Sequence, residues 1–143
     1  WRDWSSDVCS SDLGETKLGI AKRSHPNVDI KALNRDSAAK IYQEEYVKPL
    51  CLEQLPANLQ YPLLDFAVNS GVAAAVKELQ RLLPGVAVDG KLGNATVSAA
   101  NKDTRDLGLL LTQARWDLLY KLPTFNFYGR GWTHRLLKVL GDR

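Results

Sequence analysis

The segment VAAAVKELQRLL, residues 72–83, is the clearest indication of the fold in this sequence. Its larger apolar residues recur at three- and four-residue spacing, the period of an amphipathic α-helix; they are Val72, Val76, Leu79 and Leu83. The charged residues between them fall on the opposite side. Pro84 and Gly85 follow at once, and proline cannot continue a helix. The segment therefore predicts a helix that buries one face against a core.

Further helices are predicted on both sides of this segment, from apolar periodicity, capping residues and the positions of proline. Their expected ranges are 37–47, 62–69, 94–100, 104–122 and 131–140. Residues 14–34 are rich in turn signals, and no segment shows convincing strand alternation. We therefore predict an all-α fold of six or seven helices with a loop-rich N-terminal segment.

The bulk composition is that of an ordinary globular domain. The chain has 143 residues, of which 45% are hydrophobic and 24% are charged. Its net charge of +3 is too small to indicate nucleic-acid binding. No run approaches the roughly 20 apolar residues of a membrane span, and no stretch resembles a signal peptide. We expect a monomer without a membrane span or a nucleic-acid partner, and the sequence shows no export route.

The composition also excludes several kinds of chemistry. Two histidines and two cysteines, Cys9 and Cys51, show no metal-ligand spacing, so we predict no metal and no cofactor.

The C-terminal end is locally basic, through Lys121, Arg130, Arg135, Lys138 and Arg143. A solvated helix face is one interpretation of this charge. Attraction to an anionic polymer such as a cell wall is the other.

The first thirteen residues differ from the rest. The sequence contains no methionine, and residues 3–13 match the translation of a common sequencing-library adapter. Orderly sequence begins abruptly at Gly14. We interpret residues 1–13 as foreign sequence without a functional role, and expect the natural N-terminus to be missing.

Carboxylate chemistry remains possible near Gly14. Cleavage of a glycosidic bond requires an acid that protonates the leaving oxygen and a group that stabilises or captures the sugar cation. Glu15 and Thr16 lie side by side between Gly14 and Gly19, where they could be exposed at the edge of a cleft and orient a water molecule. The alternative is that Glu15 is an ordinary surface or structural carboxylate.

The segment GETKLGIAKRSHPNVDI, residues 14–30, resembles glycoside hydrolase family 108, the phage-type N-acetylmuramidases. His25 stands where this family commonly has an aromatic residue. The downstream half resembles the predicted peptidoglycan-binding domain that accompanies the family. The stretches that carry this second resemblance are residues 65–71, Leu79–Gln80, residues 88–90 with Gly93 and Thr96, and Gly131–Trp132 with Arg135.

The resemblance implies a lysozyme-like helical fold and hydrolysis of the β-1,4 bond between N-acetylmuramic acid and N-acetylglucosamine. It implies an endolysin-like, prophage-type enzyme that acts on bacterial peptidoglycan in the periplasm or outside the cell. Residues 14–54 would be part of the catalytic lobe and residues 55–143 a peptidoglycan-binding lobe, together forming one compact unit. The principal catalytic glutamate of the family lies in a Glu-Gly-Gly-Tyr motif upstream of Gly-Glu-Thr, and no such motif occurs here. We therefore expect a truncated, inactive hydrolase; the alternative is a non-catalytic peptidoglycan-binding module.

The candidate site residues follow from both arguments. Glu15 and Thr16 are expected to support catalysis without supplying the general acid. Four residues are candidates for contacts to substrate, namely Asn69, Trp132, Arg135 and Tyr42. Each has a structural alternative: a helix C-terminal amide for Asn69, core packing for both aromatic residues, and an ion pair with a nearby acid for Arg135.

Overall fold

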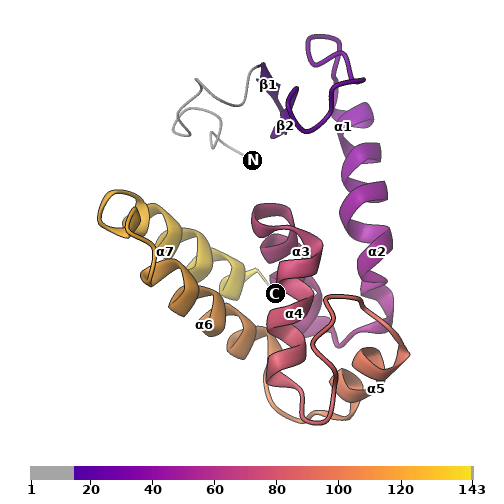
Figure 1. The fold of residues 1–143 in the computed structure, drawn as a ribbon, viewed down its shortest axis with the longest axis vertical. Coiled ribbons are helices and arrows are strands. Elements are labelled where there is room, and N and C mark those ends of the chain that lie inside the picture. Colours follow the sequence, from indigo (N-terminus) through magenta and orange to yellow (C-terminus); the bar gives the residue numbers. More distant parts are fainter. Residues whose placement is uncertain (1–14, 143) are drawn as a thin grey trace. The chain divides into compact units, whose positions relative to one another are not determined.

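The computed structural model describes residues 15–142, and these are mainly helical (Figure 1). The chain divides into two compact units, Trp1–Glu45 and Tyr46–Arg143. Within the described residues, six α-helices have eight or more residues, and the only sheet is one two-stranded hairpin. The predicted all-α class with six or seven helices is confirmed.

The described part of the first unit begins with a short β-hairpin. Strands β1 (Thr16–Lys17) and β2 (Ile20–Ala21) are antiparallel, with Thr16 opposite Ala21. Leu18 and Gly19 form the turn with φ angles of 52° and 79°, and two left-handed residues in succession are what a tight type I′ hairpin requires. Two residues per strand are too few for alternation to be visible in the sequence, which explains why no strand was predicted.

Helix α1 (Arg35–Tyr42) completes the first unit, and it begins with a capping box. The Ser37 N–H donates to Asn34 Oδ1 and the Asn34 N–H donates to Ser37 Oγ, both at 2.9 Å. The small core of the unit joins the hairpin, the following loop and α1; it contains Ile20, Ile30, Leu33 and Ala38.

An irregular segment follows α1 and runs from the end of the first unit into the second. It consists of a π-helical turn η1 (Gln43–Val47), a short helix α2 (Lys48–Leu50) and a 3₁₀ turn η2 (Leu52–Gln54). The helix expected over residues 37–47 is therefore α-helical only as far as Tyr42. Pro49 does not end it, because the proline lies in the first turn of α2, where no backbone N–H is needed.

Five helices form the second unit: α3 (Ala57–Ser70), α4 (Val72–Leu82), α5 (Asn94–Lys102), α6 (Leu107–Tyr120) and α7 (Phe125–Gly141). Helix α3 packs against α4, α6 and α7, while α6 and α7 form a helical hairpin (Figure 1). The core is built mainly from α3, α4 and α6, and its largest members include Leu59, Leu63, Phe66, Leu79 and Leu111.

Three predicted helices of this unit have wrong boundaries. Helix α3 begins at Ala57 and contains Pro62 instead of starting there. Helix α6 is shorter than the predicted 104–122, and α7 begins at Phe125 instead of residue 131, which makes α7 the longest helix. Two glycines, Gly129 and Gly131, lower the helix propensity of α7, but packing against α6 outweighs local propensity.

Candidate functional site

The Glu15–Thr16 pair lies at the start of the hairpin in the first unit. The Glu15 carbonyl accepts a hydrogen bond from the Lys22 N–H at 2.8 Å, which closes the hairpin below β1 and β2. The Glu15 side chain is 45% exposed, and Lys31 Nζ lies 3.6 Å from its carboxylate. Thr16 is also exposed. The fold therefore exposes both a carboxylate and a hydroxyl at the start of the hairpin.

The turn of the hairpin is held by Tyr42, from the last turn of α1. Its hydroxyl donates to the Leu18 carbonyl at 3.2 Å. Gly19 has a left-handed backbone, and a Cβ added there would collide with the Tyr42 hydroxyl. The structure thus explains why glycine and isoleucine occur at positions 19 and 20 of the family motif. Gly19 forms the turn, and Ile20, which is 2% exposed, packs in the small core. Tyr42 positions the hairpin, and its proposed contact to substrate stays a prediction.

His25, in the loop after the hairpin, contacts Glu45 at the end of the first unit. Its Nε2 lies 2.8 Å and 3.0 Å from the two carboxylate oxygens of Glu45. Its Nδ1 lies 3.4 Å from the carbonyl oxygen of Ala21. The histidine at this position therefore has a polar partner that an aromatic hydrocarbon ring would lack.

The second unit contains a buried cluster of one acid and two arginines. Asp65 of α3 is 5% exposed; Arg115 Nη1 of α6 and Arg135 Nη2 of α7 each donate to its carboxylate at 2.5 Å. The Arg115 guanidinium also lies over the Phe66 ring, 5.2 Å from its centroid. One carboxylate thus joins three helices by charge-assisted hydrogen bonds.

The charges of this cluster affect its neighbours. Burial lowers the pKa of Arg115, while the hydrogen bond and charge of Asp65 raise it. Arg115 Nε has no hydrogen-bond partner within the described residues. Burial first, and the Asp65 charge second, raise the pKa of Tyr61, one helical turn before Asp65. Two guanidinium groups surround one carboxylate, so the cluster has a net positive charge. Asp65 and Arg115 are both buried.

The sequence analysis named Arg135 but missed Asp65, its ion-pair partner, and Arg115, which pairs with the same carboxylate. Asp65 is the only acidic residue in α3, and it falls among apolar residues that proved to be buried. An acidic residue among apolar residues of a predicted helix was the feature of the sequence that could have indicated a buried ion pair. Arg115 sits in the predicted apolar helix 104–122 without a similar signal, because its partner is 50 residues away in the chain.

The remaining substrate candidates of the second unit have structural contacts as well. The Asn69 side-chain amide donates to the Asp65 carbonyl at 2.6 Å, within α3. Trp132 lies 6.2 Å from Phe125 and 5.9 Å from Tyr128, between ring centroids. Asn69 and Arg135 therefore both contact Asp65, at its backbone carbonyl and its carboxylate respectively, whereas Trp132 belongs to an aromatic group on α7. Their roles in binding substrate stay predictions.

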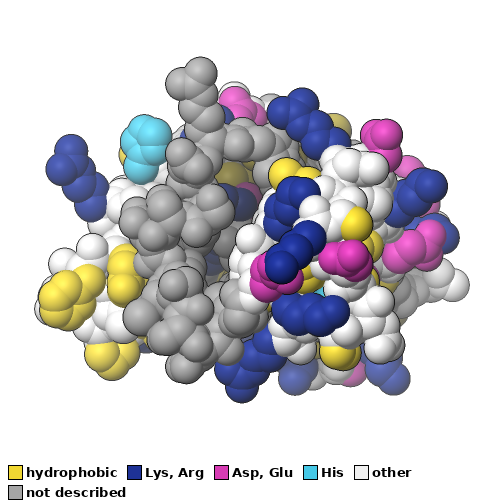
Figure 2. All heavy atoms as spheres, turned by 90° about the horizontal axis from the view of Figure 1, so that it is seen from above, with side chains coloured by type: hydrophobic (Ala, Val, Ile, Leu, Met, Phe, Trp, Pro, Cys, Tyr) yellow, Lys and Arg dark blue, Asp and Glu magenta, His cyan; other side chains and the backbone are white. Residues whose placement is uncertain are grey.

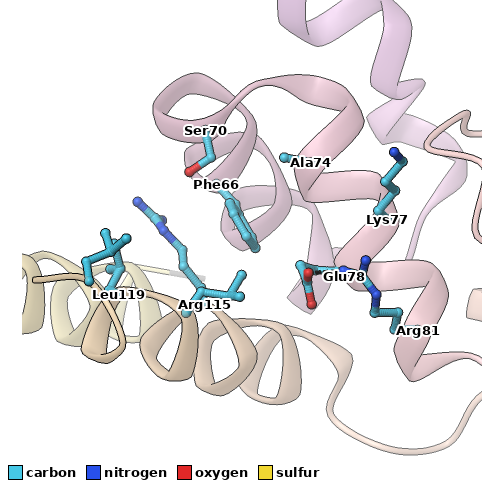
Figure 3. Close-up of a pocket in the computed structure, with 10 residues that line it drawn as sticks. Phe66, Ser70, Ala74, Lys77, Glu78, Arg81, Arg115 and Leu119 are labelled. Atoms are coloured by element: carbon cyan, nitrogen blue, oxygen red, sulfur yellow. Dashed lines mark hydrogen bonds and ion pairs between the residues drawn. The ribbon is translucent and has the colours of Figure 1, made fainter.

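A cavity of about 400 Å³ opens between α3, α4 and α6 (Figure 3). Its floor is formed by apolar side chains that include Phe66 and Leu119, beside Arg115. Its rim on α4 is charged, with Lys77 and an ion pair between Glu78 and Arg81. None of the six predicted site residues lines this cavity. Of the three charged residues of the Asp65 cluster, only Arg115 lines the cavity.

Within residues 15–142, no group of three or more His, Cys, Asp or Glu side chains is placed to hold a metal ion. None of the helices in this part of the chain has the length and apolar character that a transmembrane segment needs.

Comparison with known proteins identifies the class, a glycoside hydrolase. The profile described as glycosyl hydrolase 108 matches residues 7–71. The solved structure of SagA from Brucella abortus is 34% identical in sequence and superposes with a TM-score of 0.81, covering 95% of this chain and 83% of that chain. No curated protein matches the chain.

The chain therefore belongs to glycoside hydrolase family 108, and its helical fold is of the lysozyme-like class. The profile match begins at residue 7, inside the segment interpreted as adapter-derived and outside the described residues, so the foreign origin of residues 3–13 stays a prediction. The expected lobe boundary at residue 54 also stays a prediction; the compact units meet at residue 45.

Proposed function

We propose that this protein hydrolyses the β-1,4 bond between N-acetylmuramic acid and N-acetylglucosamine in bacterial peptidoglycan. It would act as a monomeric, endolysin-like enzyme of prophage type, in the periplasm or outside the cell. Membership of glycoside hydrolase family 108 is the observation that carries this proposal.

The hairpin geometry supports a role for Glu15 and Thr16 in this reaction. Both side chains are exposed, while the backbone beneath them is held by the Lys22 N–H and by the Tyr42 contact to the turn. A carboxylate on such a hairpin can orient a water molecule toward a sugar carbon, and an exposed hydroxyl can hydrogen-bond to water or substrate. Glu15 and Thr16 would thus position the water, and the proton for the leaving oxygen would come from another acid.

That general acid is assigned by resemblance to a Glu-Gly-Gly-Tyr motif, which the 143-residue sequence does not contain. Loss of a general acid typically lowers the rate by about 10²–10⁴-fold. We therefore propose that the 143-residue chain by itself releases few new reducing ends from peptidoglycan.

The test compares this chain with a version in which Glu-Gly-Gly-Tyr precedes Gly14. Release of reducing ends from purified peptidoglycan should be rapid only for the version with the motif. In that version E15Q should lower kcat by about 10²-fold, while E53Q, an exposed glutamate of η2, should leave it unchanged. Absence of new reducing ends from the motif-containing protein would contradict the proposal.

A non-catalytic peptidoglycan-binding module is the second candidate. It is favoured by the absence of a Glu-Gly-Gly-Tyr motif from the sequence, and Trp132 and Arg135 would supply its contacts to glycan. Sedimentation with insoluble peptidoglycan without fragment release, even after the motif is added, would support this candidate over the hydrolase.

A further inference from the structure

The outer side of the α6–α7 hairpin is unusually apolar for a surface. Phe127 is 84% exposed, Tyr120 is 64% exposed and Leu137 is 63% exposed. Apolar, basic and histidine side chains occur together at the left of Figure 2, where this hairpin lies. Exposed apolar groups of this kind commonly mark a contact surface.

Helical geometry places several of these residues in one row. Phe127, Arg130, Leu137 and Lys138 are separated by three, seven and one positions along α7, so at 100° per residue they fall within one arc. All four are exposed, while Gly129, Leu136 and Val139 on the opposite side are buried. We call Phe127, Arg130, Leu137 and Lys138 the outer face.

Beneath the outer face lies a set of packed rings. Phe125 is 5.3 Å from Trp116, 5.2 Å from Tyr120 and 6.2 Å from Trp132, measured between ring centroids. These contacts link α6 to α7 and restrict the positions of both helices. The outer face is therefore presented on a rigid support.

The charge of this region has one sign. Residues 118–141 contain Lys121, Arg130, Arg135 and Lys138 and no Asp or Glu. Arg135 turns inward to Asp65, whereas Arg130 and Lys138 are exposed on the outer face. A partner for this face should therefore be anionic and should also accept apolar side chains.

An anionic lipid bilayer meets both requirements. Basic side chains are attracted to its phosphates, and aromatic and aliphatic side chains enter the boundary between headgroups and acyl chains. A glycan fits less well, because Leu137 has no flat ring that stacks on a sugar and a polysaccharide has no apolar interior. The mixture of aliphatic, aromatic and basic groups thus favours lipid.

We propose that the outer face of the α6–α7 hairpin is a peripheral binding site for anionic membrane lipid. Phe127 and Leu137 enter the interface, and Arg130 and Lys138 contact phosphate groups. The site requires no transmembrane helix and does not depend on the hydrolase activity proposed above.

Co-sedimentation of the 143-residue chain with lipid vesicles tests this proposal. Binding should be strong to phosphatidylcholine vesicles that contain phosphatidylglycerol, weak to phosphatidylcholine alone, and weaker as salt is raised. R130Q should reduce the affinity on the order of fivefold, and F127S combined with L137S by about tenfold or more. K102Q on α5 and L109S on α6 replace exposed residues outside the face and should bind as the unaltered chain does.

Three outcomes would overturn the proposal. The first is equal binding to neutral and anionic vesicles, or none to either. The second is vesicle binding that survives F127S/L137S in a variant whose circular dichroism shows normal folding. The third is a concentration-dependent dimer, or binding to peptidoglycan alone, that the same substitutions abolish, since either would assign the face to a second copy or to glycan.

Discussion

At the scale of single residues, Asp65 is a buried carboxylate that two arginines share. Its carboxylate accepts hydrogen bonds from Arg115 and Arg135, and it brings α3, α6 and α7 together. Arg115 is 5% exposed, so it has little access to water that could replace this partner. The cost of removing Asp65 should therefore exceed that of removing a surface carboxylate.

We predict that D65N lowers the free energy of unfolding by about 3–5 kcal/mol, because it leaves a buried guanidinium without its counter-charge. Urea denaturation followed by circular dichroism measures this change. D117N, an exposed aspartate on the same helix as Arg115, should change the stability by less than about 0.5 kcal/mol. Equal effects of the two substitutions would show that the cluster does not stabilise the fold.

At the scale of secondary-structure elements, the close approach of α3 and α6 determines the second unit. Pro62 has no N–H, so the Asn58 carbonyl lacks the usual donor within α3. Gly108 lies against this carbonyl, and a Cβ on it would collide with the oxygen. The Asn58 side-chain amide also donates to Asp106 Oδ1, the N-cap of α6, at 3.0 Å.

We predict that G108A is destabilising by about 1–3 kcal/mol, because the two helices must separate to accommodate the methyl group. G131A is the matched control, since Gly131 is an exposed position in α7 with no atom within 4 Å of an added Cβ. That substitution should stabilise the protein by about 0.5–1 kcal/mol through helix propensity. Thermal or urea denaturation of both variants compares the two, and a stabilising G108A would contradict the close packing.

At the scale of the whole molecule, the described residues form two separate cores. The smaller, in the first unit, includes Ile30 at 1% exposed, and the larger, in the second unit, includes Leu59 at 0%. Stability is not uniform when separate cores support separate parts of a chain. The hairpin that carries Glu15 depends on the smaller core.

We predict that I30A, which removes about 2–5 kcal/mol of core packing, increases amide hydrogen exchange mainly within residues 15–45. L59A should increase exchange mainly within residues 46–142. Exchange measured by mass spectrometry distinguishes the two patterns. A uniform increase across the chain in both variants would mean that the two cores unfold as one cooperative unit.

The sequence alone was sufficient where the determinant is local. The helix predicted at residues 72–83 is observed at Val72–Leu82, because its apolar period and the terminating Pro84 act within one segment. The all-α class and the family motif at residues 14–30 were equally readable, since both depend on residue order within short stretches. The helix starts at Ala57 and Phe125 were not, because packing against α6 overrides a proline and two glycines.

The tertiary structure decided what the site residues contact. It places Tyr42 on the hairpin turn, Arg135 on Asp65, and an apolar and basic row on the outside of α7. These relations join residues that are 24 to 70 positions apart, or depend on which helix face remains uncovered. A sequence pattern states what each segment favours by itself, whereas partners and exposure follow from the free energy of packing the segments together.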